Sequence, residues 1–217
     1  MIEAPSVAVA FLVDCTASMG PWIHAVKTKV REIVDRVRHE HPEGDIQVGL
    51  VAYRDYGDLP RFRVLDFTTP EALQDALEPL RAEGGDDEAE DVAGALHRVL
   101  RLSWDNVDVR MVVHLADAPA HGMKFHAASL SDRFPDGDPT GLEPLDDIHA
   151  MAVQGFHYTF VKSTSATDMM LDEFYSVWNG PGFFRVLDLG QQTREFPLLV
   201  SRVVSQAIDQ HTFWQDR

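Results

Sequence analysis

Residues 7–20, VAVAFLVDCTASMG, decide both the fold and the candidate site of this chain. An unbroken apolar run leads directly into Asp14, which is typical of a parallel strand that is covered on both faces. The hydroxyls of Thr16 and Ser18 follow at alternate positions, and Gly20 stands beside a helical pattern. A strand that ends in this way permits three interpretations: a helix cap, a phosphotransfer site or part of a metal site.

Strand-like and helix-like patterns alternate along the rest of the chain. After Pro21, apolar residues recur at steps of three and four, as on the buried face of a helix. We expect strands over residues 7–14, 46–55, 61–67, 109–117, 156–163 and 182–189. We expect helices over residues 22–41, 69–80, 92–100, 145–155 and 167–179, and from about residue 194 onward. This order predicts an α/β fold, a doubly wound, mostly parallel six-stranded sheet with one antiparallel edge strand and helices on both faces. We expect it to form a single domain over residues 1–217.

The charge of the chain restricts its partners. Its 35 acidic and 19 basic residues give a formal net charge of −16, which would repel a phosphate backbone or an anionic membrane surface. Cations and basic protein surfaces are favoured instead, although acidity also serves solubility. We therefore expect neither nucleic acid nor membrane as a partner.

Cysteine content and the N-terminus bear on location. The single cysteine, Cys15, excludes an intrachain disulfide and fits a reducing compartment. Residues 1–14 carry no basic segment before their short apolar run, which reads as a strand and not as a signal peptide. No apolar run approaches the roughly 20 residues of a membrane span. We expect a cytoplasmic protein.

Two expected strands end in aspartate, at Asp14 and at Asp117. In a doubly wound sheet, ligands bind at the carboxyl ends of the strands where the strand order switches. If these strands are neighbours, both carboxylates face one crevice together with the hydroxyls of Thr16 and Ser18. An all-oxygen set is what a hard divalent cation such as Mg²⁺ needs. The alternative is that Ser18 caps the following helix and Asp117 begins a turn.

Five segments in order resemble a known family. They are FLVDCTASMG (11–20), VGLVAYRDYGD (48–58), GGDDEAEDVAGAL (84–96), HLADAPAHG (114–122) and FPDGDPTGLEP (134–144). The first resembles the DxSxS motif of the von Willebrand factor A domain, with Thr16 in place of the middle serine. Together the segments are most similar to the A domains attached to atypical alpha-kinases and to free-standing bacterial-type relatives.

The resemblance implies a metal-ion-dependent adhesion site formed by Asp14, Thr16, Ser18 and Asp117. The cation would be Mg²⁺, or Mn²⁺ or Ca²⁺, and would keep an open coordination position for an acidic side chain of a partner protein. For free-standing relatives, kinases, phosphatases or ATPases encoded nearby are the implied kinds of partner.

The third metal-binding loop departs from most of the family, which has a threonine there. Here the loop reads GGDDEAED (84–91) and contains no hydroxyl. It resembles the integrin β-type D-x-x-E variant, which implies Glu90 as a metal ligand and Asp87 as a neighbour able to support a second cation, with Asp86 or Asp91 as substitutes. The added carboxylate should bind the cation more tightly and weaken its attraction for a partner's carboxylate. The alternative is a solvated acidic N-terminus of the next helix.

Residues near the ends of the first two expected strands are candidates for a partner-binding rim. Trp22 begins the first expected helix, and Tyr53, Arg54 and Tyr56 lie at the end of the second expected strand, so all four are expected on the face that carries the metal. Aromatic and arginine side chains on such a rim are plausible partner contacts. Local packing and turn formation are the alternative.

Three further features are weaker candidates. Residues 136–147 match part of a calcium loop, but Pro139 and Pro144 stiffen it and Asp replaces the usual final Glu. Cys15 lies beside a carboxylate, which disfavours a thiolate nucleophile and favours packing. The spacing of three histidines, His114, His121 and His126, matches no common zinc motif, which favours structural roles.

These observations favour a non-enzymatic binding module. The main alternative is a Mg²⁺-dependent phosphohydrolase of haloacid-dehalogenase type, which also places an aspartate at a strand end. That class needs a second acid two residues later, where this chain has Thr16, and a lysine near the phosphate, for which Lys124 is the one close candidate. A scaffold with a non-functional metal site is the third possibility.

Overall fold

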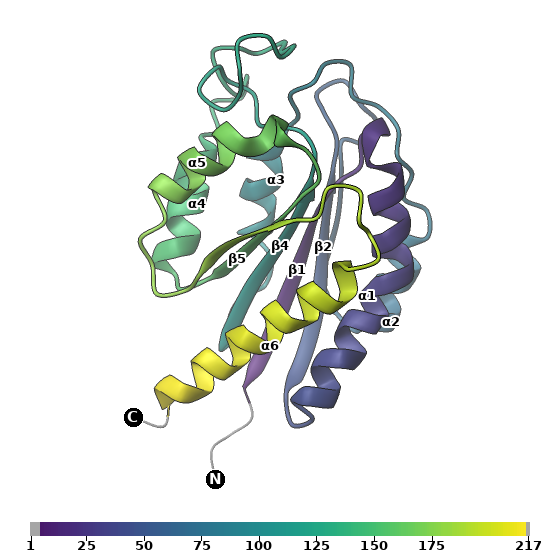
Figure 1. Ribbon diagram of the computed structural model, residues 1–217, viewed down its shortest axis with the longest axis vertical. Helices are drawn as coiled ribbons and strands as arrows, with labels where there is room; N and C mark the ends of the chain where they lie inside the picture. The colour runs from purple at the N-terminus through teal and green to yellow at the C-terminus, as the bar shows by residue number, and fades with distance from the viewer. Residues whose placement is uncertain (1–4, 216–217) are drawn as a thin grey trace.

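A six-stranded sheet with helices on both faces forms the body of the protein. The computed structural model describes residues 5–215 (Figure 1). The strands are β1 (Ser6–Asp14), β2 (Asp45–Tyr53), β3 (Phe62–Thr68), β4 (Val109–Ala116), β5 (His157–Lys162) and β6 (Phe184–Asp188). Their order across the sheet is β3-β2-β1-β4-β5-β6, with β3 antiparallel to β2 and every other neighbouring pair parallel. The predicted fold class, including the antiparallel edge strand, is confirmed.

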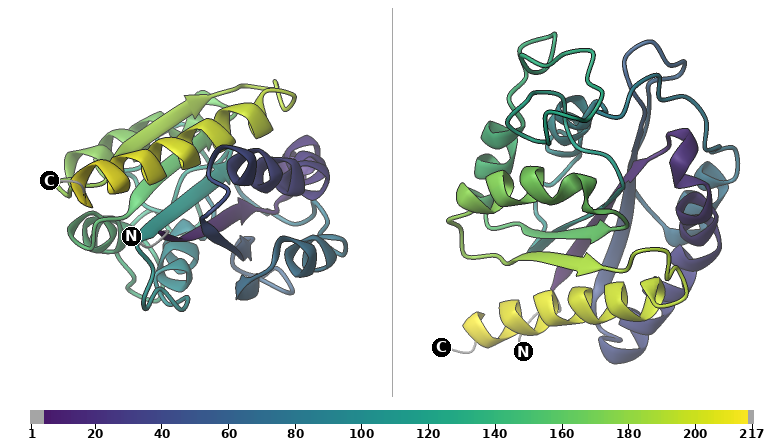
Figure 2. Two further views of the ribbon diagram at one scale, coloured as in Figure 1. Left: turned by 90° about the horizontal axis from the view of Figure 1, so that it is seen from below. Right: turned by 45° about the horizontal axis from the view of Figure 1, so that its top comes forward.

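Two groups of helices cover the two faces of this sheet (Figures 1 and 2). One face carries α1 (Gly20–Glu40), α2 (Pro70–Leu77) and α6 (Phe196–Gln215), and α1 packs against α6. The other carries α3 (Val92–Val99), α4 (Pro144–Val153) and α5 (Asp168–Ser176). Each expected helix is present, with ends that differ by a few residues. Among the described residues, no helix combines the length and the apolar character that crossing a membrane would require.

The central strand β1 explains why both faces are covered. Val9, Phe11 and Val13 point into the core under α1 and α6, whereas Ala10 and Leu12 point into the core under α3 to α5. Every residue from Val7 to Asp14 is buried, so the continuous apolar run reflects a strand without a solvent face. β3 at the edge has only half-buried and exposed positions, because one of its sides has no neighbouring strand.

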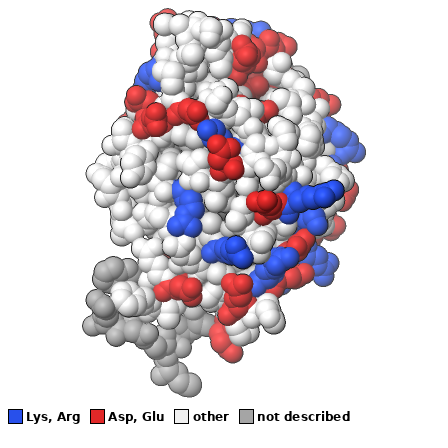
Figure 3. Space-filling model, in the orientation of Figure 1, with Lys and Arg blue, Asp and Glu red and all other residues white. Residues whose placement is uncertain are grey.

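Charge is distributed over the surface. On the face that carries α1 and α6, acidic and basic side chains are interspersed (Figure 3). The excess of acidic residues is therefore not gathered into one patch on this face. By contrast, the carboxylates at the ends of β1 and β4 lie close together, and these form the candidate site.

Candidate metal centre

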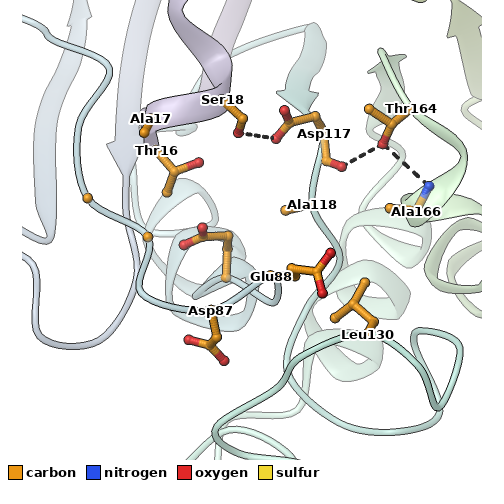
Figure 4. A pocket seen from close by; sticks show the side chains of 13 residues that line it. Thr16, Ala17, Ser18, Asp87, Glu88, Asp117, Ala118, Leu130, Thr164 and Ala166 are labelled. Atoms are coloured by element: carbon orange, nitrogen blue, oxygen red, sulfur yellow. Dashed lines mark hydrogen bonds between the residues drawn. The ribbon is translucent and has the colours of Figure 1, made fainter.

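The candidate site lies at the carboxyl ends of β1 and β4, which are neighbours in the sheet. From β1 the chain builds β2 and β3 on one side and β4 to β6 on the other, so β1 and β4 flank the switch point at which ligands bind in this architecture. Asp14 is the last residue of β1, and Asp117 directly follows β4. A cavity of about 420 Å³ opens beside them, and its wall includes Thr16, Ser18 and Asp117 (Figure 4).

Asp14 is fully buried and holds Thr16 in place. Its Oδ1 accepts hydrogen bonds from the Thr16 amide at 2.8 Å and from the Thr16 hydroxyl at 2.7 Å. Its Oδ2 has no hydrogen-bond partner. A buried carboxylate oxygen without a partner is costly, so the site is built to receive a positively charged or proton-donating group here.

Ser18 and Asp117 lie side by side at the edge of the cavity (Figure 4). The Ser18 hydroxyl donates to Asp117 Oδ1 at 3.0 Å, and α1 begins at Gly20 without a side-chain cap. The helix-cap interpretation of Ser18 is therefore wrong. Thr164, which follows β5, donates its hydroxyl to the backbone carbonyl of Asp117 at 2.7 Å. The sequence gives no signal for Thr164, because only the pairing of β4 with β5 brings it here.

Glu90 comes from the loop before α3 and lies in the cavity wall. Its side chain is nearly inaccessible, and its Oε2 has no hydrogen-bond partner. The backbone fixes its position, because the Glu90 amide donates to the Pro119 carbonyl at 2.9 Å. Gly85 faces it with a φ of +83°, and a Cβ at Gly85 would lie 2.9 Å from Glu90 Oε1 and 3.3 Å from Thr16 Cβ. The glycine therefore preserves the space between Glu90 and Thr16.

The carboxylates of this site destabilise one another's charged forms. Burial, and then the charge of Asp117, raises the pKa of Asp14 to about 7. Burial, and then the charges of Asp14 and Asp55, raises the pKa of Glu90 to about 10. Burial also raises the pKa of Asp117. Apposed buried carboxylates behave in this way when no cation balances them.

The residues present fit a hard divalent cation. Asp14 and Glu90 each offer a buried oxygen without a partner, Thr16 and Ser18 offer hydroxyls, and Asp117 offers a third carboxylate. Oxygen ligands of this kind suit Mg²⁺, Mn²⁺ or Ca²⁺. The geometry thus brings together the five residues that the resemblance implied.

The other acidic residues of the loop before α3 have different partners. Asp91 caps α3, because its Oδ1 accepts from the Gly94 amide at 2.7 Å, and its Oδ2 lies 3.4 Å from Arg61. Asp86 is exposed and lies 3.3 Å from Arg133. Neither is placed to substitute for Glu90. Asp87 lines the far side of the cavity, and its buried Oδ1 has no hydrogen-bond partner.

The predicted partner-binding rim is wrong for three of its four residues. Trp22 lies on the inner face of α1, where it packs edge-to-face against Phe196 with ring centroids 5.9 Å apart. Tyr53 points into the core at the end of β2, and its hydroxyl lies 2.9 Å from His114 Nε2. Arg54 is buried and forms a 2.9 Å ion pair with Glu83.

Tyr56 keeps a half-buried position above the sheet. Its hydroxyl donates to Asp138 at 2.7 Å, and the guanidinium of Arg61 lies 4.2 Å from its ring centroid. Asp138 also accepts from the Thr140 amide at 2.8 Å and from the Leu142 amide at 3.3 Å. The carboxylate of Asp138 thus organises the turn that resembled a calcium loop, and local hydrogen bonds explain the pattern.

The remaining candidates have structural surroundings. Cys15 is buried, and burial, followed by the charge of Asp14, raises the pKa of its thiol to about 12, which leaves no thiolate nucleophile. His114 lies in the core between Tyr53 and Tyr158, and burial lowers its pKa to about 3. His121 and His126 lie in the loop after β4, and both contact Asp132.

Known proteins show the same architecture. The pilus adhesin SpaC from Lactobacillus rhamnosus GG superposes with a TM-score of 0.65 and 13% identity, covering 96% of this chain and 31% of the adhesin. The vWF domain of the pilus tip protein Mfa5 from Porphyromonas gingivalis gives a TM-score of 0.64 with 10% identity over 95% of this chain and 96% of that domain. The SpRpn10 VWA domain gives 0.59 with 16% identity over 92% of this chain and 94% of that domain. At these identities the likeness concerns the fold alone.

Comparison of sequences adds relatives of higher identity. The alpha-protein kinase vwkA of Dictyostelium discoideum is 37% identical over 142 residues, which are 64% of this chain and 22% of the kinase. The human von Willebrand factor A domain-containing protein 7 is 33% identical over 96 residues, 44% of this chain and 10% of that protein. This chain thus spans about a fifth or less of the length of these relatives. The family model of the von Willebrand factor A domain matches residues 8–129, and the chain belongs to this family.

Proposed function

We propose that this chain is a non-enzymatic protein-binding module whose metal centre bridges to a carboxylate of a partner protein. The observation that carries the proposal is the pair of buried carboxylate oxygens, Asp14 Oδ2 and Glu90 Oε2, that lack hydrogen-bond partners beside an open cavity. The family is one of protein-interaction modules, which supports a binding role.

Asp14, Thr16, Ser18, Glu90 and Asp117 would hold the cation, with Mg²⁺ the expected ion. When bound, the cation supplies an electrophilic position that an anionic oxygen of the partner can occupy. The protein's own contribution is orientation: Asp14 fixes the Thr16 hydroxyl, and Asp117 fixes that of Ser18. The cavity wall also contains Ala118, Leu130 and Ala166, which provide a small apolar surface around an entering side chain.

Charge balance sets the strength of this bridge. Asp14, Glu90 and Asp117 together offer more negative charge than one divalent cation can neutralise. Such a centre should hold its cation tightly and attract an external carboxylate weakly. We therefore expect affinity for a partner to depend also on protein surface around the cavity, such as the half-buried Tyr56.

One relative supports a proposal about the kind of partner. vwkA is named as an alpha-protein kinase, and its matching segment is a minor part of its length. We propose a kinase, phosphatase or ATPase as the partner, and a cytoplasmic location in which Cys15 remains reduced.

The structure favours binding over phosphoryl transfer. Among the described residues that line the cavity, none is a lysine or an arginine that could hold a phosphate. Lys124, the candidate for that role, forms an exposed 2.9 Å ion pair with Glu143. Thr16 occupies the position at which a phosphohydrolase of haloacid-dehalogenase type needs an acid.

The test is a pull-down from lysate of the source organism, with Mg²⁺ or with EDTA, read by mass spectrometry. We expect a partner that is retained by the wild-type chain in Mg²⁺ and lost in EDTA or with Asp14→Ala. Glu88→Gln is the matched control, because Glu88 lines the same cavity but is exposed and accepts from the Ser131 amide at 2.9 Å. A partner retained equally in EDTA would contradict the metal bridge. Phosphate release from a generic substrate that is lost in Asp14→Asn would overturn the non-enzymatic assignment.

A further inference from the structure

A second cluster of titratable side chains lies beside the metal centre and has a different chemistry. We call Asp55, Asp87, His121 and Asp132 the histidine–aspartate cluster. Asp55 follows β2, Asp87 precedes α3, and the other two belong to the long loop 117–143. Asp87, His121 and Asp132 each offer a ligand atom within 4.8 Å of the others. Three loops that are distant in sequence therefore converge on one imidazole.

Asp132 is fully engaged in orienting this cluster. One of its oxygens accepts from His121 Nδ1 and from the Phe134 amide, both at 2.7 Å. The other accepts from the Gly122 amide at 2.8 Å and lies 2.9 Å from His126 Nε2. With four contacts, Asp132 has no lone pair left to bind a metal ion. It instead fixes the orientation of the His121 ring and its tautomer. A carboxylate behind a histidine in this way is the usual second-shell partner of a metal-binding imidazole.

Asp55 and Asp87, by contrast, have oxygens to spare. Asp55 is completely buried; its Oδ1 lies 2.7 Å from His121 Nε2, and its Oδ2 has no hydrogen-bond partner. Asp87 Oδ2 accepts from the Arg133 amide at 2.6 Å, while its buried Oδ1 has no partner. Both side chains lie close to His121, and burial, together with the charge of Asp55, raises the pKa of Asp87.

The groups beside these carboxylates that can carry positive charge are two histidines, His121 and His126. Within residues 5–215, no lysine or arginine forms an ion pair with Asp55, Asp87 or Asp132. Even if both histidines are protonated, the three carboxylates outnumber their two positive charges. A buried carboxylate oxygen without a partner, such as Asp55 Oδ2, is a position at which a cation would be stabilising.

We infer that the histidine–aspartate cluster is a second cation site, which prefers Zn²⁺ and can also take Mn²⁺, in which His121 Nε2 and the carboxylates of Asp55 and Asp87 are the ligands. One imidazole with carboxylates suits these ions, whereas the oxygen-only centre suits Mg²⁺. His121 Nε2 and Asp55 Oδ1 are 2.7 Å apart. If each lay about 2.0–2.2 Å from the ion, this contact would need to open only slightly. The imidazole binds as the neutral base, so the Nε2 proton passes to solvent as the metal enters.

An ion at this position would join the loop after β2, the loop before α3 and the loop after β4. Asp87 lines the main cavity, and Glu90 lies three residues beyond it. The second ion would thus fix the far wall of the cavity without contacting Asp14. This inference does not rest on the proposed binding function, since each site has its own ligands.

The test isolates the second site by removing the first. Zn²⁺ is titrated calorimetrically into the Asp14→Ala chain and, separately, into the wild-type chain in excess Mg²⁺. We expect one equivalent of Zn²⁺ in both cases. Adding Asp87→Asn should weaken this binding at least tenfold, and Asp132→Asn should weaken it about 10–100-fold by releasing His121. The control is Asp86→Asn, since Asp86 is exposed and faces Arg133; it should leave Zn²⁺ affinity unchanged.

A spectroscopic measurement distinguishes the two sites directly. Mn²⁺ bound to the Asp14→Ala chain should show coupling to imidazole nitrogen in pulsed electron paramagnetic resonance, and His121→Ala should abolish it. Circular dichroism checks the folding of each variant. If His121→Ala does not fold, the loss of Zn²⁺ affinity in Asp87→Asn tests the site instead, because Asp87 is at a half-exposed position. Absence of Zn²⁺ binding in the Asp14→Ala chain, or Mn²⁺ without nitrogen coupling, would overturn the inference while leaving the oxygen-only centre untouched.

Discussion

At the residue scale, the features that most strongly indicate a cation are two atoms, Asp14 Oδ2 and Glu90 Oε2. Each is a buried carboxylate oxygen without a hydrogen-bond partner, and each belongs to a group whose pKa is strongly raised. Folding normally avoids such atoms, since an unsatisfied buried polar group costs about 1–3 kcal/mol and a charged one more. Their retention next to two hydroxyls is explained if a cation completes the site.

Removing the charge of Glu90 tests its role as a ligand. Glu90→Gln keeps the size of the side chain but loses the anionic oxygen, and we expect Mg²⁺ affinity to fall at least about tenfold, or about 1.4 kcal/mol. Isothermal titration calorimetry measures the affinity, with Glu88→Gln as the control that lines the same cavity. Equal Mg²⁺ affinity in Glu90→Gln and wild type would exclude Glu90 as a ligand.

The raised pKa values predict how Mg²⁺ binding depends on pH. With pKa values of about 7 for Asp14 and about 10 for Glu90, the metal-free chain holds protons at neutral pH that the cation must displace. Affinity should therefore rise as the pH increases from 5 to 8, and binding at pH 7 should release protons.

Calorimetry in buffers of different ionisation enthalpy counts the released protons, and Glu90→Gln should release fewer. Binding at pH 7 with no proton release would show that the carboxylates are already ionised.

The raised pKa of Asp14 also predicts how the stability of the metal-free chain depends on pH. Because burial raises the pKa of Asp14 from its ordinary value of 3.8 to about 7, the folded state binds this proton more tightly, and stability falls as the pH rises from about 4 through 7.

At the scale of elements, the loop before α3 combines two tasks in adjacent residues. Asp91 caps α3 through the Gly94 amide, and Glu90 directly before it lines the cavity. The helix cap thus sets the direction in which Glu90 enters the site. The acidic run is therefore both the helix N-terminus and the candidate ligand loop, which the sequence presented as alternatives.

Loss of the cap should affect both stability and metal binding. Asp91→Ala is expected to lower the free energy of unfolding by about 1–2 kcal/mol and to weaken Mg²⁺ binding, because the start of α3 is no longer fixed. Asp91→Asn keeps an acceptor for the Gly94 amide and should lose less. Urea denaturation gives the stabilities; an Asp91→Ala chain as stable as wild type would show that the backbone holds this turn without the cap.

The elements themselves follow from the sequence, whereas the contacts between them do not. Apolar runs and three- and four-residue periods located the strands and helices because these patterns reflect burial within one element. Trp22 and Tyr53 were misplaced because nearness to a strand end does not reveal which face a side chain occupies. Asp55 and His121, which lie 66 positions apart, meet only through the order of the strands.

At the scale of the whole molecule, the strand order is what builds the site. The switch point between β1 and β4 places Asp14 and Asp117 together, and loops from both halves of the sheet, carrying Glu90 and Thr164, close around them. The sequence predicted that Asp14 and Asp117 lie at the ends of two strands and meet if those strands are neighbours; the strand order shows that they are. The sequence could not predict that Gly85 must remain without a side chain to keep the cavity open.

Anomalous diffraction from crystals grown with Mn²⁺ tests whether a cation with an open coordination position binds beside Asp14. We expect an anomalous peak in the cavity beside Asp14. The ion should have oxygen ligands from Thr16, Ser18 and Glu90, and a water molecule should occupy a coordination position that is open to solvent. The proposed metal bridge is contradicted if no peak appears there, or if protein side chains fill every coordination position, because a closed site has no place for a partner's carboxylate.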